Sequence, residues 1–443
     1  MNPIGASILA VVLLVVLGAP RRWALLGAMA GVLYLTQGQQ IPVLGLNLFA
    51  LRFVELAGFA RVMMRREFSF GDLNRIDRAV IWLYSVVTLI FLVRSSDGLA
   101  YQIGIAVDAF LCYFTFRGLL QGLEDYTWFL RAFLLLLVPY AALILLEAFT
   151  QRNVFTVMGG IDYGSWVRDG RPRCQGSFRH PSLLGTLGAT FVPLYIGLAL
   201  TPERRKLAIV GLFSCLAIVW ASNSGGPASC AAVGIAGWFG WKIRTRMKLV
   251  RRGTVGFVLL MALAMKAPIW YLIARVSAIT GGDGWHRSYL MDVAFQHLGE
   301  WWLAGMPILA TRDWFPYNLG VTGGSDITNQ FIAFGLDAGL AGIALFIFLL
   351  VAAFKALGRA LDAVRSAPDA PPSTEYTLWG LGVMLVAHMF NWLGITYFDQ
   401  TYAVWFLQLS VIAALTTECS RAFSAQSESE SPVDEVPSMP VSS

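Results

Sequence analysis

Long apolar runs limit the fold of this chain more than any other feature of its sequence. The runs are continuous rather than amphipathic, and many approach the roughly 20 residues that an α-helix needs to cross a bilayer. Hydrophobic residues make up 57% of the 443 residues and charged residues only 14%, and a soluble protein of this length needs more charge to cover its surface. The sequence therefore predicts an all-α, polytopic integral membrane protein with about 12–13 transmembrane helices.

The segments expected to span the membrane share this length and composition. They are 4–19, 23–36, 42–60, 79–93, 99–116, 127–149, 182–200, 207–222, 227–241, 253–271, 331–354, 376–394 and 401–417. No basic residue precedes the first segment, so we interpret it as a transmembrane helix rather than a signal peptide.

Basic residues divide the connections between these segments into two groups. Connections rich in lysine and arginine occur at 20–22, 61–78, 203–206, 242–252 and 355–365, and the alternating layout puts all of them on one side. Because basic loops usually stay in the cytoplasm, we expect the N-terminus outside and the C-terminus inside. The net charge of +6 comes largely from these loops and does not indicate nucleic-acid binding.

This layout divides the chain into six parts. They are the N-terminal transmembrane helices (1–150), an arginine-rich outer loop (151–181), the central transmembrane helices (182–271), a large outer loop (272–330), the C-terminal transmembrane helices (331–420) and a cytoplasmic tail (421–443). The tail is polar, acidic and proline-bearing, so we expect it to be disordered. The large loop holds an apolar, periodic piece near 286–302, which predicts an interfacial amphipathic helix with Trp301 and Trp302 at headgroup depth.

Arginines crowd the 150–181 loop, which contains no lysine. This loop breaks the charge trend of the other connections, and arginine is suited to planar, bidentate capture of phosphate. The pattern predicts an anionic ligand at the outer membrane boundary. The alternative is that these side chains only reach lipid headgroups, as arginines beside membrane helices often do. The arginines are Arg152, Arg168, Arg171, Arg173 and Arg179, and Arg287 lies in the second outer loop.

A few other polar residues fall inside or beside the expected spans. Asp108 is expected to have a structural partner, and Glu147 lies near enough to the outer boundary to face the same cavity as the arginines. His388 and Asn391 share a helix face, where hydrogen bonding between helices is the commoner role. Asp399 lies in a short outer loop and is a further candidate for the site.

Three stretches of the chain resemble one known family. They are "GSFRHPSLLGTLGATFVPL" (176–194), "WHRSYLMDVAFQHLGEWWLAGMP" (285–307) and "GGSDITNQFIAFGLDAGLAGIALFIFLL" (323–350). Their order and spacing resemble the O-antigen ligase and O-antigen (exopolysaccharide) polymerase superfamily of integral membrane glycosyltransferases. The chain departs from the family pattern at Thr328, where the ligases have a histidine, and in "SNSGGP" (222–227), where many members have a Ser-Arg-Gly turn. Both departures favour a polymerase over a ligase.

The resemblance implies a multi-pass glycosyltransferase of the bacterial inner membrane, with its N-terminus in the periplasm. An acceptor sugar hydroxyl would attack an undecaprenyl-diphosphate-linked glycan at the periplasmic face, and the lipid diphosphate would leave. The family needs no cofactor, nucleotide sugar or metal. The implied partners are the lipid-linked donor, an acceptor glycan, membrane lipids and other polysaccharide assembly proteins.

The resemblance also implies roles for particular residues. Outward-facing arginines can neutralise the charge that develops on the leaving diphosphate. Those expected to bind it are Arg171, Arg173, Arg179 and Arg287. The acceptor hydroxyl needs a general base, and the candidates are His180, His286 and Asp326. The supporting residues are Asn329 and Glu147.

Two other functions remain open from the sequence. One is a transporter or flippase for a lipid-linked anionic glycan, and the other is a non-catalytic member of a polysaccharide assembly complex. The spans hold few polar residues, the outer loops are long and charged, and the two halves show no clear internal repeat. This distribution favours chemistry at one face over alternating access.

Overall fold

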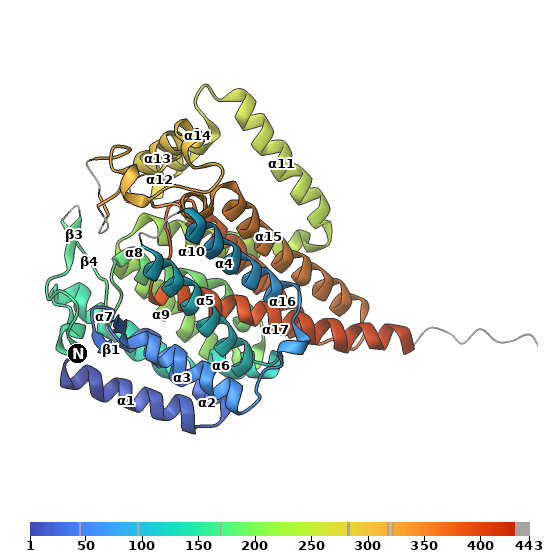
Figure 1. The fold of residues 1–443 in the computed structure, drawn as a ribbon. Helices are drawn as coiled ribbons and strands as arrows, with labels where there is room; N and C mark the ends of the chain where they lie inside the picture. Colours follow the sequence, from blue (N-terminus) through green and yellow to red (C-terminus); the bar gives the residue numbers. More distant parts are fainter. Residues whose placement is uncertain are drawn as a thin grey trace, which may run out of the picture.

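The computed structural model describes residues 1–43, 46–94, 98–168, 170–280, 284–316, 319–320 and 323–429. Helices dominate these residues (Figure 1). The α-helices are α1 (Pro3–Gly18), α2 (Arg21–Tyr34), α3 (Ala50–Met64), α4 (Arg75–Arg94), α5 (Leu99–Leu119), α6 (Leu123–Ala132), α7 (Leu134–Thr150), α8 (Pro181–Ala199), α9 (Arg205–Ser222), α10 (Gly225–Phe239), α11 (Met247–Ala264), α12 (Leu272–Thr280), α13 (Gly284–Gln296), α14 (Leu298–Trp301), α15 (Gln330–Ser366), α16 (Pro372–Trp392) and α17 (Gln400–Ser429). Two short antiparallel hairpins accompany them, β1 (Gln40–Val43) with β2 (Leu46–Phe49) and β3 (Trp166–Arg168) with β4 (Arg171–Arg173).

Six helices among the described residues are long and apolar enough to cross a membrane. They are Arg75–Arg94, Leu123–Thr150, Pro181–Ala199, Pro202–Ser222, Gln330–Ser366 and Gln400–Phe423. A seventh is added if Gly225–Ala264 and Ile269–Ser277, which are bent by 101°, form one broken span. The structure therefore supports a multi-pass α-helical membrane protein, with fewer full-length spans than the about 12–13 expected.

Some of the expected spans form helices that are short for a membrane crossing. α1 has 16 residues and α2 has 14, less than the roughly 20 that cross a bilayer at right angles. The expected span 42–60 is wrong in its first part, where β1 and β2 pair with Pro42 opposite Asn47. Proline disrupts a helix interior, so the helix begins later, at Ala50.

α8 lies at the centre of the bundle, and nearly all of its residues are buried. Hydrogen bonds tie it to α16, where Asn391 Nδ2 donates to Thr186 Oγ1 over 2.9 Å. His388 on α16 contacts Tyr397 Oη at 2.7 Å and Gln408 Oε1 on α17. The prediction that His388 and Asn391 bond between helices is confirmed. Asp108 also has the expected structural partner, since Arg52 Nε donates to its carboxylate over 2.6 Å.

The region 272–330 folds into a compact helical unit rather than an extended loop. Its helices α13 and α14 and the residues that follow them form a second hydrophobic cluster with the start of α15. Trp301 belongs to this cluster, is only 2% exposed, and donates its indole N–H to Ala294 O over 2.8 Å. Neighbouring protein therefore covers Trp301, and its expected place at headgroup depth stays a prediction. Trp302 is 49% exposed.

A break in α15 holds this helical unit against the bundle. Ala338 and Gly339 depart from helical geometry, and Gly339 has a φ of 65°. A Cβ at Gly339 would lie 2.5 Å from Trp302 O and 2.6 Å from Leu303 O, so only glycine permits this approach. Leu340 N then donates to Trp302 O over 2.8 Å.

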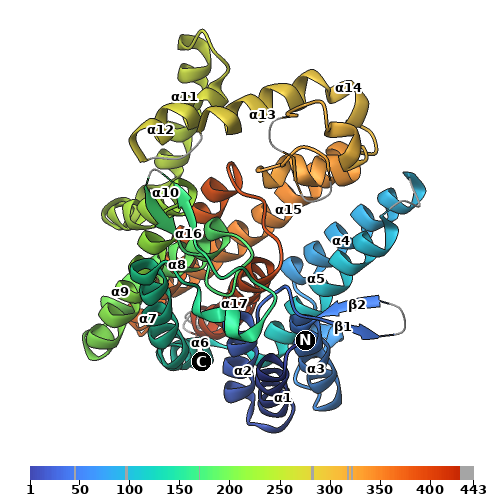
Figure 2. The same ribbon diagram turned by 90° about the vertical axis from the view of Figure 1, so that its left-hand side faces the viewer.

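The two ends of the bundle differ in what they carry. One end, here called the hairpin face, carries β3–β4 and the N-terminus, and Figure 2 looks onto it. Asn2 Nδ2 donates to Val157 O over 2.7 Å and Thr36 Oγ1 donates to Gly159 O over 2.5 Å. The start of the chain and the 150–181 loop therefore share this face.

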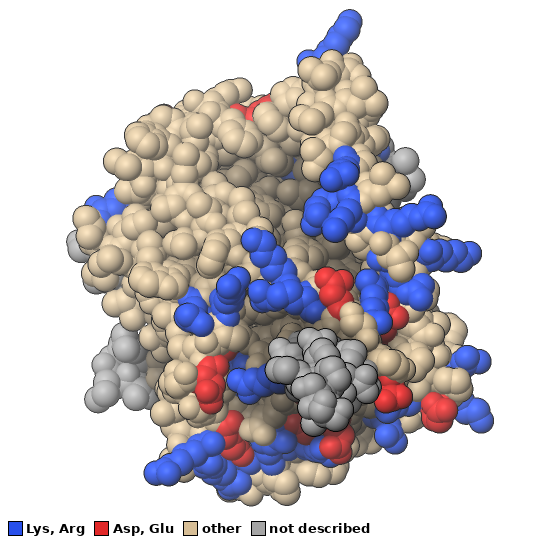
Figure 3. Space-filling view, turned by 90° about the vertical axis from the view of Figure 1, so that its right-hand side faces the viewer, with Lys and Arg blue, Asp and Glu red and all other residues tan. Residues whose placement is uncertain are grey.

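The opposite end, here called the basic face, gathers many lysine and arginine side chains (Figure 3). Ion pairs link the basic connections to one another there, since Glu375 Oε1 lies 3.2 Å from Arg244 Nε and 2.6 Å from Arg365 Nε. Arg61 Nη1 donates to Ala19 O over 2.6 Å, which joins two further basic connections. The prediction that these connections share one side agrees with this arrangement.

α17 extends beyond the expected start of the disordered tail at 421. The helix continues to Ser429, so the expected boundary is wrong for 421–429. Residues 430–443 of the expected tail lie outside the described residues.

Candidate functional site

A buried carboxylate anchors the arginine-rich loop to the bundle. Glu147 near the end of α7 is fully buried, and its oxygens accept hydrogen bonds from Gln175 N and Gly176 N, each over 3.0 Å. Ser165 Oγ donates to the same carboxylate over 3.1 Å. Two backbone N–H groups and one hydroxyl of the loop thereby cover the Glu147 carboxylate, so the expectation that it faces a cavity with the arginines is wrong. Its role in the structure is to hold the loop in place.

Arg173 lies at the end of β4, where the loop enters the helix bundle. Its residue is only 5% exposed, and Nη2 donates to Ser224 Oγ over 3.0 Å, with Ser182 Oγ at 3.5 Å. The buried Nε has no hydrogen-bond partner, and no ion pair to Arg173 occurs among the described residues. Burying a cation without an acidic partner costs free energy, and here the N–H donor at Nε also stays without a hydrogen bond.

Electrostatics around Arg173 are unfavourable for its charge. Burial is the main reason why the pKa of Arg173 is lowered to about 10, and the nearby charges of Arg168 and Arg287 also contribute to this shift. Like charges brought together in a partly dry site create a strong local preference for an anion. Arg168 and Arg287, from two distant parts of the chain, are therefore both near enough to Arg173 for their charges to act on it.

Arg287, which belongs to the 272–330 region, lies close to Arg173. A Cβ built at Gly394 would lie 2.8 Å from Arg287 Cδ and 2.9 Å from its Nε, and one at Gly226 would lie 3.5 Å from its Nη2. Glycine at 394 thus leaves the space that the arginine fills. Gly226 is in the first turn of α10, whose N-cap is Ser224. Arg173 and Arg287 therefore both contact the N-terminus of α10, which adds a favourable field for negative charge.

The other two predicted arginines have partners of their own. Arg179 Nε lies 2.9 Å from Asp399 Oδ2, and the guanidinium sits 5.5 Å above the ring of Phe49. Arg171 lies over Trp220 at 5.7 Å and is exposed. Both therefore flank Arg173 rather than share its buried position.

Asp399 joins the site through its ion pair with Arg179. Burial raises the pKa of Asp399 to about 6, although Arg179 acts in the opposite direction. The backbone at Asp399 has a φ of 51°, an uncommon conformation that aspartate tolerates better than most residues.

His180 is the N-cap of α8. Its Nδ1 accepts a hydrogen bond from Ser182 N over 3.1 Å, and its ring packs edge-on against Trp166 at 5.5 Å. Burial lowers the pKa of His180 to about 4, with Arg173 and Arg168 contributing in the same direction. The imidazole is therefore neutral near pH 7, and because Nδ1 accepts, the proton resides on Nε2. In this state the ring can donate a hydrogen bond from Nε2, and its basic nitrogen, Nδ1, already accepts the bond from Ser182 N.

His286 and Asp326 form a second pair of candidates within the 272–330 region. His286 is buried on α13, beside Arg287, and its ring centroid lies 4.1 Å from that of Phe315. His286 is near enough to Asp326 to lower the pKa of that carboxyl electrostatically, although desolvation raises it overall. The structure therefore brings these two predicted residues together.

Asn329 caps α15 rather than lining the arginine cluster. Its Oδ1 accepts from Phe331 N over 3.0 Å and from Ile332 N over 3.1 Å, and its Nδ2 donates to Leu393 O over 3.4 Å. The preceding Thr328 has a buried Oγ1 that forms no hydrogen bond. An asparagine cap at this junction satisfies helix donors that burial would otherwise leave unpaired.

The connection between α16 and α17, residues 393–399, was largely missed by sequence reasoning. Leu393 O accepts from Asn329, Gly394 lies against Arg287, and Asp399 pairs with Arg179. One short connection therefore contacts both outer loops that carry predicted site residues. Only the acidic Asp399 offered a sequence signal, since backbone carbonyls and a glycine leave no chemical pattern.

No group of three or more His, Cys, Asp or Glu side chains in the described ranges is arranged to hold a metal ion. Comparison with protein-family models and with curated proteins returns no match to this chain.

Proposed function

We propose that this chain is a cell-surface polysaccharide polymerase that transfers an undecaprenyl-diphosphate-linked glycan to an acceptor sugar hydroxyl. The observation that carries the proposal is Arg173, a buried guanidinium with an unused Nε donor and no acidic partner among the described residues. Arg168 and Arg287 lie near enough to depress its pKa. A doubly charged diphosphate is a ligand of the right sign and geometry for such a cluster.

The proposed chemistry follows from where the charges lie. As the acceptor oxygen attacks the anomeric carbon, the bond to the diphosphate oxygen breaks and negative charge grows on the leaving group. Fixed guanidinium groups and the N-terminus of α10 would stabilise that charge without reorganising. Arg173 and Arg287 take this role, while Arg171 and Arg179 border the donor from the rim.

The proton of the acceptor hydroxyl needs an acceptor of its own. We assign this role to the His286–Asp326 pair in preference to His180, because Nδ1 of His180 already accepts the backbone N–H of Ser182. His286 is adjacent to Arg287 in sequence, so the base and a diphosphate-binding group arrive on the same helix. Glu147 and Asn329 support the site by holding its loop and its helix end.

The proposed topology places the hairpin face in the periplasm and the basic face in the cytoplasm of a bacterial inner membrane. The gathering of basic connections at one end supports this orientation through the positive-inside rule. A polymerase is preferred over a ligase because Thr328 stands where the ligases of the resembled family carry a histidine.

A reconstitution assay with the purified protein tests the proposal. An undecaprenyl-diphosphate-linked oligosaccharide is supplied, and both glycan length and released undecaprenyl diphosphate are measured. We expect longer glycans with matching lipid release, and loss of both in Arg173→Ala. Arg152→Ala is the matched control, since Arg152 belongs to the same loop but is exposed and only lies over Tyr163 at 5.9 Å.

Each other outcome assigns a different function. Transfer to a lipid core without lengthening indicates a ligase. Donor binding without released lipid diphosphate indicates a transporter or a non-catalytic assembly protein. Equal activity of Arg173→Ala and the wild type contradicts the proposed site.

A further inference from the structure

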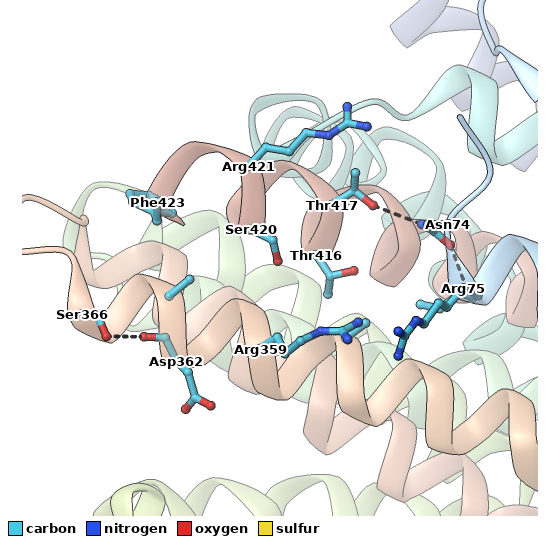
Figure 4. Close-up of a pocket in the computed structure, with 13 residues that line it drawn as sticks. Asn74, Arg75, Arg359, Asp362, Ser366, Thr416, Thr417, Ser420, Arg421 and Phe423 are labelled. Carbon is cyan, nitrogen blue, oxygen red and sulfur yellow. Dashed lines mark hydrogen bonds between the residues drawn. The ribbon is translucent and has the colours of Figure 1, made fainter. Parts of the chain in front are cut away.

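A groove opens on the basic face, at the opposite end of the bundle from the arginine cluster. It lies between the start of α4, the last turns of α15 and the part of α17 from Thr416 to Phe423, and its volume is about 580 Å³. Figure 4 shows the side chains that surround it. The lining residues used below are Arg75, Arg359, Asp362, Thr417, Ser420 and Arg421.

Two guanidinium groups converge in this groove without an acid between them. Figure 4 shows Arg75 from α4 and Arg359 from α15 pointing toward each other, while the Asp362 carboxylate points away. Arg421 from α17 lines the same groove. Within the described part of the chain, none of these three arginines forms an ion pair or a side-chain hydrogen bond. Like charges held this way repel each other unless an anion lies between them.

The opposite wall of the groove is polar and well ordered. Thr417 Oγ1 accepts a hydrogen bond from Asn74 Nδ2 over 3.1 Å and donates to Ala413 O over 2.8 Å. Asn74 also donates to Ala413 O over 3.1 Å, so α4 and α17 are joined at this point. The Ser420 hydroxyl lines the groove beside them and can donate to a ligand oxygen.

Apolar side chains share the groove with these polar groups. Ile76, Ala356, Ala363 and Phe423 belong to its lining. The groove therefore offers cationic and hydroxyl groups for a headgroup and an apolar surface for the start of an acyl chain. Its place at the helix ends, among the basic side chains of Figure 3, is the depth at which anionic lipid headgroups meet a membrane protein.

We propose that this groove binds a phosphate group, and that its source is the headgroup of an anionic phospholipid. Arg75 and Arg359 hold the phosphate oxygens from two sides, and Ser420 donates from α17. A bound phosphate neutralises the facing guanidinium groups and ties α4, α15 and α17 together. The site lies at the other end of the bundle from the proposed diphosphate cluster and is independent of the proposed enzymatic function.

Native mass spectrometry of the purified full-length protein tests this proposal. The probes are phosphatidylglycerol, zwitterionic phosphatidylcholine and inorganic phosphate, each added to delipidated protein. We expect phosphatidylglycerol to be retained in preference to phosphatidylcholine. In the double variant Arg75→Gln, Arg359→Gln we expect that retention to fall about tenfold or more, since two charge-assisted hydrogen bonds are lost.

Arg78→Gln is the matched control. Arg78 is exposed on the same helix, but it lies outside the groove lining, and its Nε contacts only Asn74 O at 3.4 Å. Its substitution should leave phosphatidylglycerol retention unchanged. Thermal unfolding of each variant without lipid shows whether the fold is intact, and the charge-conserving Arg75→Lys, Arg359→Lys variant should restore part of the retention.

The outcomes separate the two sources of phosphate and the failure of the site. Saturable inorganic phosphate binding that the double variant abolishes, without lipid preference, supports the phosphate site and assigns a soluble ligand. Equal retention of both lipids with no phosphate binding overturns the proposal. An equal loss in Arg78→Gln also overturns it, because it would show a diffuse charge effect.

Discussion

Replacing Arg173 by lysine tests whether the cluster needs a fixed guanidinium or only a positive charge. The surroundings lower the pKa of Arg173 from 12.5 to about 10, mainly through burial. Lysine ordinarily has a pKa of about 10.4, so the same surroundings would bring it to about 8. Arginine therefore stays charged from about pH 7 to pH 9, whereas the side chain in Arg173→Lys would lose most of its charge over that range.

The geometry adds a second loss to this electrostatic one. Lysine has a single nitrogen, so it cannot both keep the bond to Ser224 and present a second donor in place of Nε. One lost charge-assisted hydrogen bond corresponds to about tenfold weaker binding or more. At about pH 9 a group with a pKa near 8 is roughly one-tenth protonated, which adds about another tenfold.

Calorimetric titration with inorganic pyrophosphate measures both losses. We expect the affinity of Arg173→Lys to be about tenfold below wild type at pH 7 and about a hundredfold below it at pH 9. Because each ratio compares two proteins at one pH, the ionisation of pyrophosphate itself cancels. Arg152→Lys should bind as the wild type does. A ratio near one, or a ratio that does not change with pH, would refute the reasoning about Arg173.

Three further substitutions probe the supporting structure. Glu147→Gln leaves one buried loop N–H without an acceptor and should cost about 1–3 kcal/mol, measured as a lower unfolding temperature and faster proteolysis of 150–181. His180→Asn preserves a cap for Ser182 N, so polymer formation should stay within a few-fold of wild type; complete loss with an intact fold would instead make His180 the base. Trp301→Phe removes the indole donor and should cost about 1 kcal/mol in thermal unfolding, with no change expected in pyrophosphate affinity.

The sequence predicted a helix correctly where a local feature, such as a proline that suits the first helical turn, marks its start. α8 (Pro181–Ala199) agrees closely with the expected span 182–200, and proline suits the first turn of a helix. The α3 segment was harder, because the first part of its apolar run, around Pro42, forms a hairpin. Apolarity alone does not distinguish a spanning helix from a shorter buried one.

The arginine-rich loop shows where composition stops being informative. Arg173 and Arg179 look equivalent in the sequence, six residues apart in one basic stretch. The structure pairs Arg179 with Asp399, which lies more than 200 residues later, and leaves Arg173 buried beside two serines. Long-range partners of this kind have no local sequence signal. The same holds for Trp301, whose burial depends on how α13 and α14 fold back on α15.

The sequence by itself determined that this chain is a helical membrane protein and that its basic connections gather on one side, because both properties follow from local composition. It also showed that the 150–181 loop is rich in arginine. Only the tertiary structure decided which of those arginines keep an unused donor, because that depends on the acids, serines and glycines that distant segments bring to them. It likewise decided that Arg75 and Arg359, 284 residues apart, face each other across a groove, since their convergence comes from the packing of α4 against α15.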